Sequence, residues 1–151
     1  MTGVQTCALP ISNGALTTPD TLDIEPVTPG VAALSNGTII AQHVDGSYVT
    51  ATSPANPGEI LTIYLAGMGL TDVSVQTGQV SPSTPLAHPT VQPTVTVNGE
   101  AAQIGFAGLT PQAVGLYQIN FTVPSDAPSG NLKLVVSQGN VQSNMGTIAV
   151  Q

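Results

Sequence analysis

The sequence has very few charged residues and a single cysteine, and both shortages exclude classes of function. Of its 151 residues, one is Lys or Arg and eight are Asp or Glu, which gives a formal net charge of −7. Nucleic acid and anionic membrane surfaces are therefore poor partners, because the chain has no basic patch to neutralise phosphates. Cys7 is the only cysteine, so neither an internal disulfide nor a thiolate metal site is expected. No hydrophobic run approaches the roughly 20 residues of a membrane-spanning helix, so membrane insertion is not expected.

The first eleven residues resemble the translation of a short-read sequencing adapter, and Ser12 fits the same reading frame. We therefore expect residues 1–12 to be an artefact rather than native protein, and we leave them out of the fold prediction. This exclusion also removes Cys7, so a cysteine nucleophile or a lipid anchor is not expected there. The true N-terminus and any signal peptide are then expected to be missing from the sequence.

The polar character of the chain comes from Thr, Ser, Asn and Gln, together with 16 Gly and 13 Pro. This composition is typical of a turn-rich β protein. A hydrophobic fraction of 41% is too high for a disordered chain. About 120 structured residues would bury roughly two-thirds of the unfolded chain's surface, which is enough for one core without disulfides.

Strict alternation of apolar and polar residues predicts three of the strands. Residues 117–123 alternate without a break, which places Tyr117 and the three apolar residues that follow it on one buried face. The segments 59–66 and 131–137 alternate in the same way, with Lys133 on the outer face. We expect the core to consist mainly of Ile119 and Phe121, facing Leu61, Ile63, Leu134 and Val136.

Turn signals divide the rest of the chain into short strands. Asp45-Gly46 and Asn98-Gly99 each favour positive φ angles, so each predicts a hairpin with a type I′ turn. A third turn at residues 138–140 precedes a final strand near 146–150. No segment has the apolar spacing of a helix. Residues 31–151 are therefore predicted to form an all-β, immunoglobulin-like antiparallel β-sandwich of about seven short strands.

Three features leave alternatives open or lie outside this pattern. Residues 13–30 are predicted to be the last strand of a truncated preceding domain, over 20–27, followed by a linker; that strand would have no sheet to pair with. The segment from Thr71 to Pro93 is a long polar loop that either covers a sheet edge or binds a ligand. Tyr117 either forms a tyrosine corner, with its hydroxyl bonded to nearby backbone, or is a core aromatic whose hydroxyl reaches water.

Six short motifs follow one another in the sequence: SPANPGE at 53–59, IYLAGMGL at 63–70, FAGLTP at 106–111, VGLYQIN at 114–120, VP at 123–124 and QSN at 142–144. In order and spacing they resemble an uncharacterised family, the Solibacter-type C-terminal domain of large secreted proteins from soil bacteria. The resemblance covers about residues 27–151 and implies the second half of a longer two-sandwich domain. No catalytic or ligand residues are established for this family, so the resemblance implies a location and not an activity.

No constellation of residues indicates catalysis, so we expect no enzyme activity, no cofactor, and no catalytic, cofactor-binding or metal-binding residue. His43 and His88 are the only histidines, and both are predicted to be solvated polar residues. Asp20, Asp23 and Glu25 come closest to a calcium site, but they lie on the strand outside the predicted sandwich.

Two functions of different class fit these expectations. The preferred one is a non-catalytic structural or adhesive C-terminal module of a larger secreted or cell-surface bacterial protein, whose partners are the preceding domains of the same chain. The alternative is a carbohydrate-binding accessory module of a secreted hydrolase, using the 71–93 loop and Tyr48, the most plausible exposed ring. Extracellular polysaccharide or protein is the external partner class that both readings allow.

Overall fold

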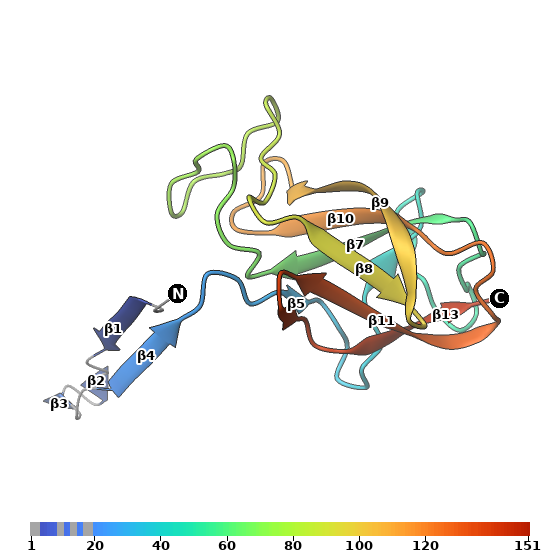
Figure 1. Cartoon of the computed structure of the whole chain (residues 1–151), viewed down its shortest axis with the longest axis horizontal. Coiled ribbons are helices and arrows are strands. Elements are labelled where there is room, and N and C mark those ends of the chain that lie inside the picture. The colour runs from blue at the N-terminus through green and yellow to red at the C-terminus, as the bar shows by residue number, and fades with distance from the viewer. Residues whose placement is uncertain (1–3, 9–10, 13–14, 17–19) are drawn as a thin grey trace.

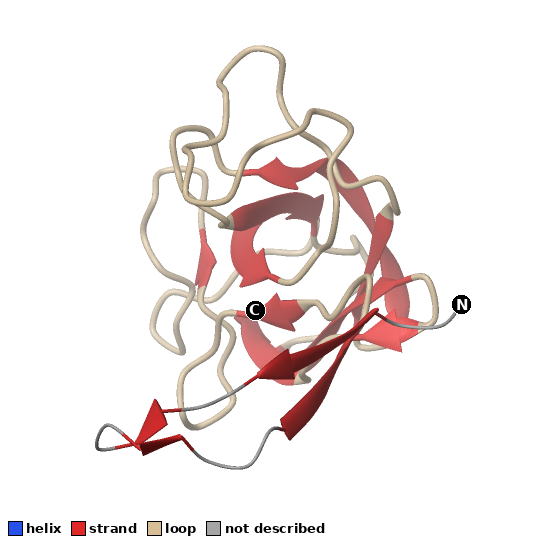
Figure 2. Cartoon of the chain, turned by 90° about the vertical axis from the view of Figure 1, so that its left-hand side faces the viewer, coloured by secondary structure: helices blue, strands red, loops and turns tan. Residues whose placement is uncertain are grey.

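The computed structural model describes residues 4–8, 11–12, 15–16 and 20–151, with side chains from Glu25 onward. The regular structure of these residues is entirely β-strand (Figures 1 and 2), and none of them forms an apolar helix of membrane-spanning length. The strands are β1 (Val4–Ala8), β2 (Ile11–Ser12), β3 (Ala15–Leu16), β4 (Asp20–Ile24), β5 (Gly30–Val31), β6 (Ala41–Gln42), β7 (Ile60–Ala66), β8 (Pro93–Val97), β9 (Glu100–Leu109), β10 (Tyr117–Thr122), β11 (Gly130–Gln138), β12 (Val141–Gln142) and β13 (Gly146–Val150).

Nine of the strands form one sheet. Its order is β12-β11-β8-β9-β10-β7-β5, with β13 beside β11 and β6 beside β7. All of these strand pairs are antiparallel, and the sheet curls around its core (Figure 2). The prediction of an all-β antiparallel fold is therefore confirmed, while the finer prediction of an immunoglobulin-like sandwich stays a prediction.

Strand β9 belongs to both halves of the curled sheet. It pairs with β8 over residues 100–102 and with β10 over residues 103–109. Between Asn120 and Phe121 of β10 the register shifts past Gly105 of β9. Such a bulge bends the strand that carries the extra residue, so it helps to turn the sheet from one half into the other.

The two open sides of the curled sheet are linked by backbone hydrogen bonds. Thr38 and Ala55 form isolated parallel bridges with Thr147 and Val150 of β13, and the Ile39 amide donates to the Thr147 carbonyl over 2.9 Å. The segment around Thr38 leads into β6, which pairs with β7. Exposed strand edges invite pairing with other chains, and these bridges cover the free edge of β13.

The core lies inside this curl, as the alternation predicts. Ile119 and Phe121 are fully buried, and Lys133 is on the exposed face of β11. The alternating residues of β7 and β11 complete the predicted core: Leu61, Ile63, Leu134 and Val136, each with 0% of its surface exposed. The predicted register of all three strands is therefore confirmed.

The predicted hairpin turns differ in outcome. Asn98 and Gly99 both have positive φ, at 54° and 88°, and they join the paired residues Val97 and Glu100, as a type I′ turn requires. The predicted type I′ turn at Asp45-Gly46 is wrong, because only Gly46 has a positive φ there. In that hairpin the loop has three residues, with Gly46 in the left-handed position that ends such loops.

The tyrosine-corner interpretation of Tyr117 is wrong, whereas the interpretation as a core aromatic is confirmed except for the partner of its hydroxyl. Its side chain is buried, with 7% exposed, and its hydroxyl donates to the Gly69 carbonyl over 2.5 Å. Gly69 lies 48 residues earlier in the chain, so this is neither the local contact of a tyrosine corner nor a bond to water. Burial raises the pKa of the Tyr117 phenol, which keeps it a hydrogen-bond donor.

The N-terminal part forms a separate two-stranded ribbon (Figure 1), in which β4 pairs with β1 from Val4–Ile24 to Ala8–Asp20. The prediction that the strand over 20–27 has no pairing partner is therefore wrong. Its partner lies within the segment 1–12 that resembles an adapter, of which residues 1–3 and 9–10 lie outside the described residues.

The segment that follows β4 packs against two glycines that follow β7. The Thr28 amide donates to the Gly67 carbonyl over 2.8 Å, within the segment predicted as a linker. A Cβ on Gly67 would lie 2.1 Å from the Thr28 carbonyl oxygen, and one on Gly69 would lie 2.5 Å from that of Pro26. Both glycines also have positive φ, so no other residue type fits this crossing.

Candidate functional site

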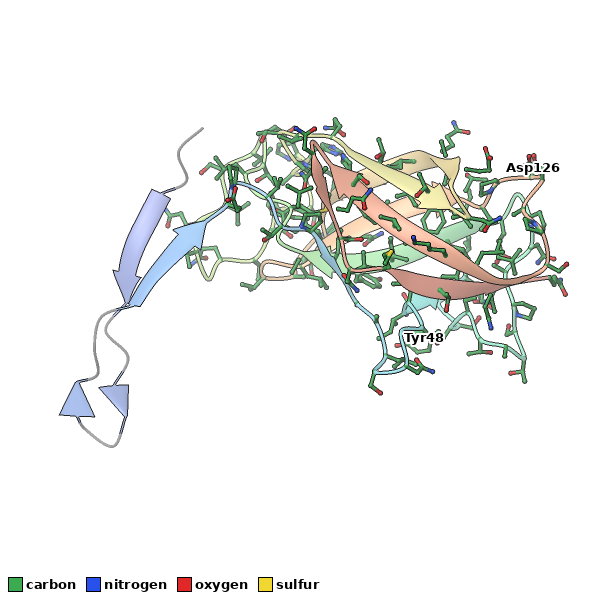
Figure 3. All side chains as sticks on the ribbon, turned by 60° about the horizontal axis from the view of Figure 1, so that its bottom comes forward. Tyr48 and Asp126 are labelled. Carbon is green, nitrogen blue, oxygen red and sulfur yellow. The ribbon has the colours of Figure 1, made fainter. Side chains whose placement is uncertain are left out.

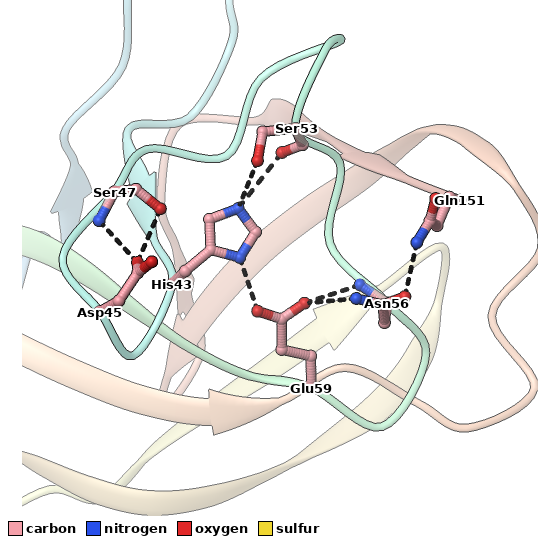
Figure 4. Close-up of polar contacts among 7 residues, drawn as sticks. All are labelled: His43, Asp45, Ser47, Ser53, Asn56, Glu59 and Gln151. Atoms are coloured by element: carbon pink, nitrogen blue, oxygen red, sulfur yellow. Dashed lines mark hydrogen bonds and ion pairs between the residues drawn. The ribbon is translucent and has the colours of Figure 1, made fainter.

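Polar side chains converge between the hairpin that follows β6 and the loop that precedes β7 (Figure 4). The Nδ1 atom of His43 lies 2.5 Å from Oε1 of Glu59, and its Nε2 lies 3.2 Å from the carbonyl oxygen of Ser53. The side chains of His43 and Glu59 are only 12% and 21% exposed. The prediction that His43 is simply solvated is therefore wrong. We call His43, Ser53, Asn56, Glu59 and Gln151 the His43 cluster.

Local backbone geometry fixes the members of the His43 cluster. His43 follows β6 directly, and its backbone amide and carbonyl close the Gly46 hairpin. On the other side, Oε2 of Glu59 accepts bonds from the backbone and side-chain amides of Asn56, at 2.8 and 3.2 Å. The side-chain oxygen Oδ1 of Asn56 in turn accepts from Nε2 of Gln151 over 2.6 Å. Asn56 thus holds the Glu59 carboxylate in place independently of the bond to His43.

These contacts shift the pKa values of both partners toward their charged forms. The hydrogen bond to Glu59 raises the pKa of His43 above its ordinary value of 6.5, although partial burial opposes the shift. Burial alone would raise the pKa of Glu59, but the bonds from Asn56 and His43 outweigh it and lower that pKa. The pKa of the neighbouring Asp45 is also lowered, by hydrogen bonds from the Ser47 hydroxyl and amide.

The order Ser53, His43 and Glu59 resembles the triad of a serine hydrolase, but three observations argue against a working triad at this place. Oγ of Ser53 is 3.5 Å from Nε2 of His43, while the Ser53 carbonyl oxygen is closer, at 3.2 Å. An N–H pointing at a carbonyl cannot act as the general base that a triad needs. The residue after Ser53 is Pro54, which has no N–H, and the Ser53 amide donates to Thr50. Neither backbone position can therefore supply an oxyanion hole.

The predicted 71–93 loop is present and forms one wall of a cleft of about 580 Å³. The opposite wall is the turn between β9 and β10, with Val114 and Tyr117. Leu70 and Val114 are both well exposed, at 80% and 55%. The residues that line the cleft carry hydroxyl, amide and apolar groups and no charge, so an ionic ligand would find no counter-charge among them.

Two buried side chains hold this loop against the sheet. Nε2 of Gln138, which is fully buried at the end of β11, donates to the carbonyls of Met68 and Val91, at 2.9 and 2.7 Å. It thereby ties together the two ends of the loop. Oγ of Ser81 donates to the carbonyl of Thr110, which fixes the middle. The bonds of these side chains make the loop part of the folded body.

His88 also fastens the loop rather than being solvated as predicted. Its Nδ1 lies 2.8 Å from the Ala107 carbonyl oxygen, so this nitrogen donates. The ring meets Phe106 edge to face at 5.4 Å. The His88 backbone amide donates to the Asp72 carboxylate over 2.7 Å, and this bond lowers the pKa of Asp72.

Tyr48 and the 71–93 loop, which the carbohydrate prediction combines, belong to different surfaces. Tyr48 is 57% exposed (Figure 3) and borders an apolar groove of about 300 Å³ together with Leu34, Ile39 and Val49. No residue lines both this groove and the cleft of the loop. The structure therefore does not bring the two predicted elements into one site.

The remaining sequence candidates are the three carboxylates Asp20, Asp23 and Glu25. The side chains of Asp20 and Asp23 lie outside the described residues, and Glu25 is exposed. Within the described part of the chain, no three His, Cys, Asp or Glu side chains come together as metal ligands would. Among the described residues, titratable side chains meet in the His43 cluster. No sequence signal pointed to it, because β6 has only two residues.

No protein-family model, no curated protein and no solved structure matches this chain. The resemblance to the Solibacter-type C-terminal domain family stays a prediction, and so does the location that it implies.

Proposed function

We propose that the chain is a non-catalytic structural or adhesive module of a larger secreted or cell-surface bacterial protein, in which it supports the preceding domains. The observation that carries this proposal is that the polar side chains at the candidate sites bind loops of the same chain. Both histidines and the carboxylates beside them fasten loops to the sheet. Hydrogen bonds of this kind stabilise the loops that carry them, which is the role expected of polar side chains in a structural module.

The fold that we propose for this module is a variant of the immunoglobulin-like sandwich. One half of the curled sheet contains β10 and β7, and the other contains β8, β11 and β13. Each half turns alternate residues inward, as Ile119 of β10 and Leu134 of β11 illustrate. Two faces that bury alternate residues against each other are the basis of a β-sandwich, and here β9 connects them.

Limited proteolysis combined with an esterase assay tests this proposal. A structural module should yield one protease-resistant fragment that includes the 71–93 loop, because that loop is bonded at both ends and in its middle. Hydrolysis of p-nitrophenyl acetate should be equally slow for the native chain and for Ser53→Ala. Turnover that disappears in Ser53→Ala, or rapid cleavage inside the loop, would overturn the proposal.

The second candidate is a carbohydrate-binding module, and the observation that favours it is the exposed ring of Tyr48 beside an apolar groove. Aromatic rings with a polar end are common at binding surfaces. A glycan array on the native chain should then give signals that Tyr48→Ala abolishes. Val44→Ala is the matched control, because Val44 is 80% exposed on the same hairpin and lies outside the groove. Absence of any glycan signal would exclude this candidate.

A further inference from the structure

His43 connects the hairpin that turns at Gly46 to two other segments. It lies on the hairpin that turns at Gly46, and its two ring nitrogens contact Ser53 in the following loop and Glu59 at the start of β7. The ring is only 12% exposed. Its contacts therefore depend on protein groups and not mainly on water.

Both contacts require an N–H on the ring. The Glu59 carboxylate and the Ser53 carbonyl oxygen can only accept hydrogen bonds, so Nδ1 and Nε2 must both donate. An imidazole ring with two N–H groups is the protonated, positively charged form. The arrangement in Figure 4 is thus the one that His43 adopts when it carries a proton.

Loss of that proton changes one contact and leaves the other. The carboxylate of Glu59 keeps the proton on Nδ1, because a charged acceptor forms the stronger bond. Nε2 then has no hydrogen and directs its lone pair at the Ser53 carbonyl oxygen, 3.2 Å away. The two atoms repel each other because both are acceptors. The Ser53 hydroxyl, 3.5 Å away, is then the group of Ser53 that can donate to Nε2, so the contact with the carbonyl is exchanged for a longer one.

The charges around the ring are all of one sign. Glu59 faces His43 from the start of β7, and Asp45 faces it from the same hairpin. The only Lys or Arg of the chain is Lys133, on the exposed face of β11, and it is not among the groups that act on His43. Tyr48, on the returning side of the hairpin, borders the apolar groove. Nothing with a positive charge therefore competes with the protonated ring.

We propose that His43, Ser53 and Glu59 form a pH-dependent latch, which fastens the hairpin at residues 43–48 to the loop at residues 53–59 when His43 is protonated and loosens it when His43 is neutral. The folded pKa of His43 is raised, so the latch stabilises the fold below the unfolded pKa of about 6.5. This stabilisation is lost as the pH rises through the folded pKa. Tyr48 of the hairpin also lines the apolar groove together with Leu34 and Ile39, so opening of the latch moves one wall of that groove.

Proton NMR of the full chain tests the latch residue by residue. With only two histidines, the ring signals of His43 can be assigned by comparison with His43→Gln, and His88 serves as an internal reference. His43 should titrate above 6.5, and Glu59→Gln should lower its midpoint. Asp126→Asn, which removes an equally negative side chain in the turn after β10 (Figure 3), should not. A midpoint at or below 6.5, or equal shifts in both variants, would overturn the proposal.

Amide hydrogen exchange distinguishes a latch, whose loss opens the loop, from a salt bridge whose loss leaves the loop closed. In the native chain, protection of the amides at residues 47–56 should fall with the same midpoint as the His43 ring signal, while protection in β10 should stay constant. In His43→Gln this pH dependence should vanish, whatever the overall stability of the variant. Protection that is independent of pH in the native chain, while His43 titrates, would show that deprotonation does not open the loop.

Discussion

Phe121 is the side chain whose removal should damage this fold most. It lies on β10, which has β7 and β9 on either side, and none of its surface is exposed. Its register partners are Leu61 and Ile104, so truncation to Ala leaves a cavity that packed strands surround and cannot fill. Phe121→Ala should therefore destabilise the fold by about 3–5 kcal/mol. For a domain of this size that corresponds to a melting temperature lower by roughly 10–20 °C.

The second phenylalanine provides a matched control, because the chain contains only two. Phe106 is partly buried and meets His88 edge to face, so Phe106→Ala should destabilise by about 1–2 kcal/mol. Urea unfolding of both variants, followed by fluorescence or circular dichroism, gives the two free energies of unfolding. Equal losses, or a larger loss for Phe106→Ala, would refute the placement of Phe121 in the centre of the core.

Three further predictions concern residues that hold loops and turns. Gln138→Leu keeps the size of the side chain but leaves the carbonyls of Met68 and Val91 without their side-chain donor, so it should destabilise by about 1–3 kcal/mol and increase hydrogen exchange in the 71–93 loop. The side-chain amide of Asn144 donates to the Val31 carbonyl over 3.0 Å and accepts from the Val31 amide over 2.7 Å. Asn144→Asp removes the donating bond and should therefore lower the melting temperature, as differential scanning calorimetry would show. Gly99→Ala should destabilise by about 1 kcal/mol or more because its φ is 88°, whereas Gly105→Ala, with no atom nearer than 3.8 Å to its new Cβ, should have a smaller effect in the same denaturation assay.

The parts of the fold that the sequence predicts correctly are those with a strict period or a demanding turn. Residues 117–123 alternate without a break, and a shift of one residue would expose Ile119 and Phe121 while burying Asn120. Asn98-Gly99 is equally restrictive, since a two-residue hairpin needs positive φ at both positions. In these places local chemistry allows one solution, and the tertiary structure adopts it.

The parts that sequence alone misses depend on contacts between distant segments. Asp45-Gly46 carries the same turn signal as Asn98-Gly99, but His43 pairs with Ser47 and leaves three residues in the loop. Tyr117 bonds to a carbonyl 48 residues away, and His43 meets Glu59 because a two-residue strand pairs with β7. No periodicity or motif encodes such contacts, so the prediction that His43 is solvated had no local signal against it.

The scarcity of charge explains how the loops of this molecule are held. With one Lys or Arg in the chain, ion pairs between ordinary side chains are almost unavailable, and buried carbonyls of the loops need other donors. The amides of Gln138 and Asn144 supply them, and because amides do not titrate, these joints are the same at every pH. His43 is the joint that differs, since its two bonds need a proton that the ring can lose near neutral pH. A change of pH across the midpoint of His43 should therefore act on the loops around His43 and leave the bonds of Gln138 to Met68 and Val91 in place.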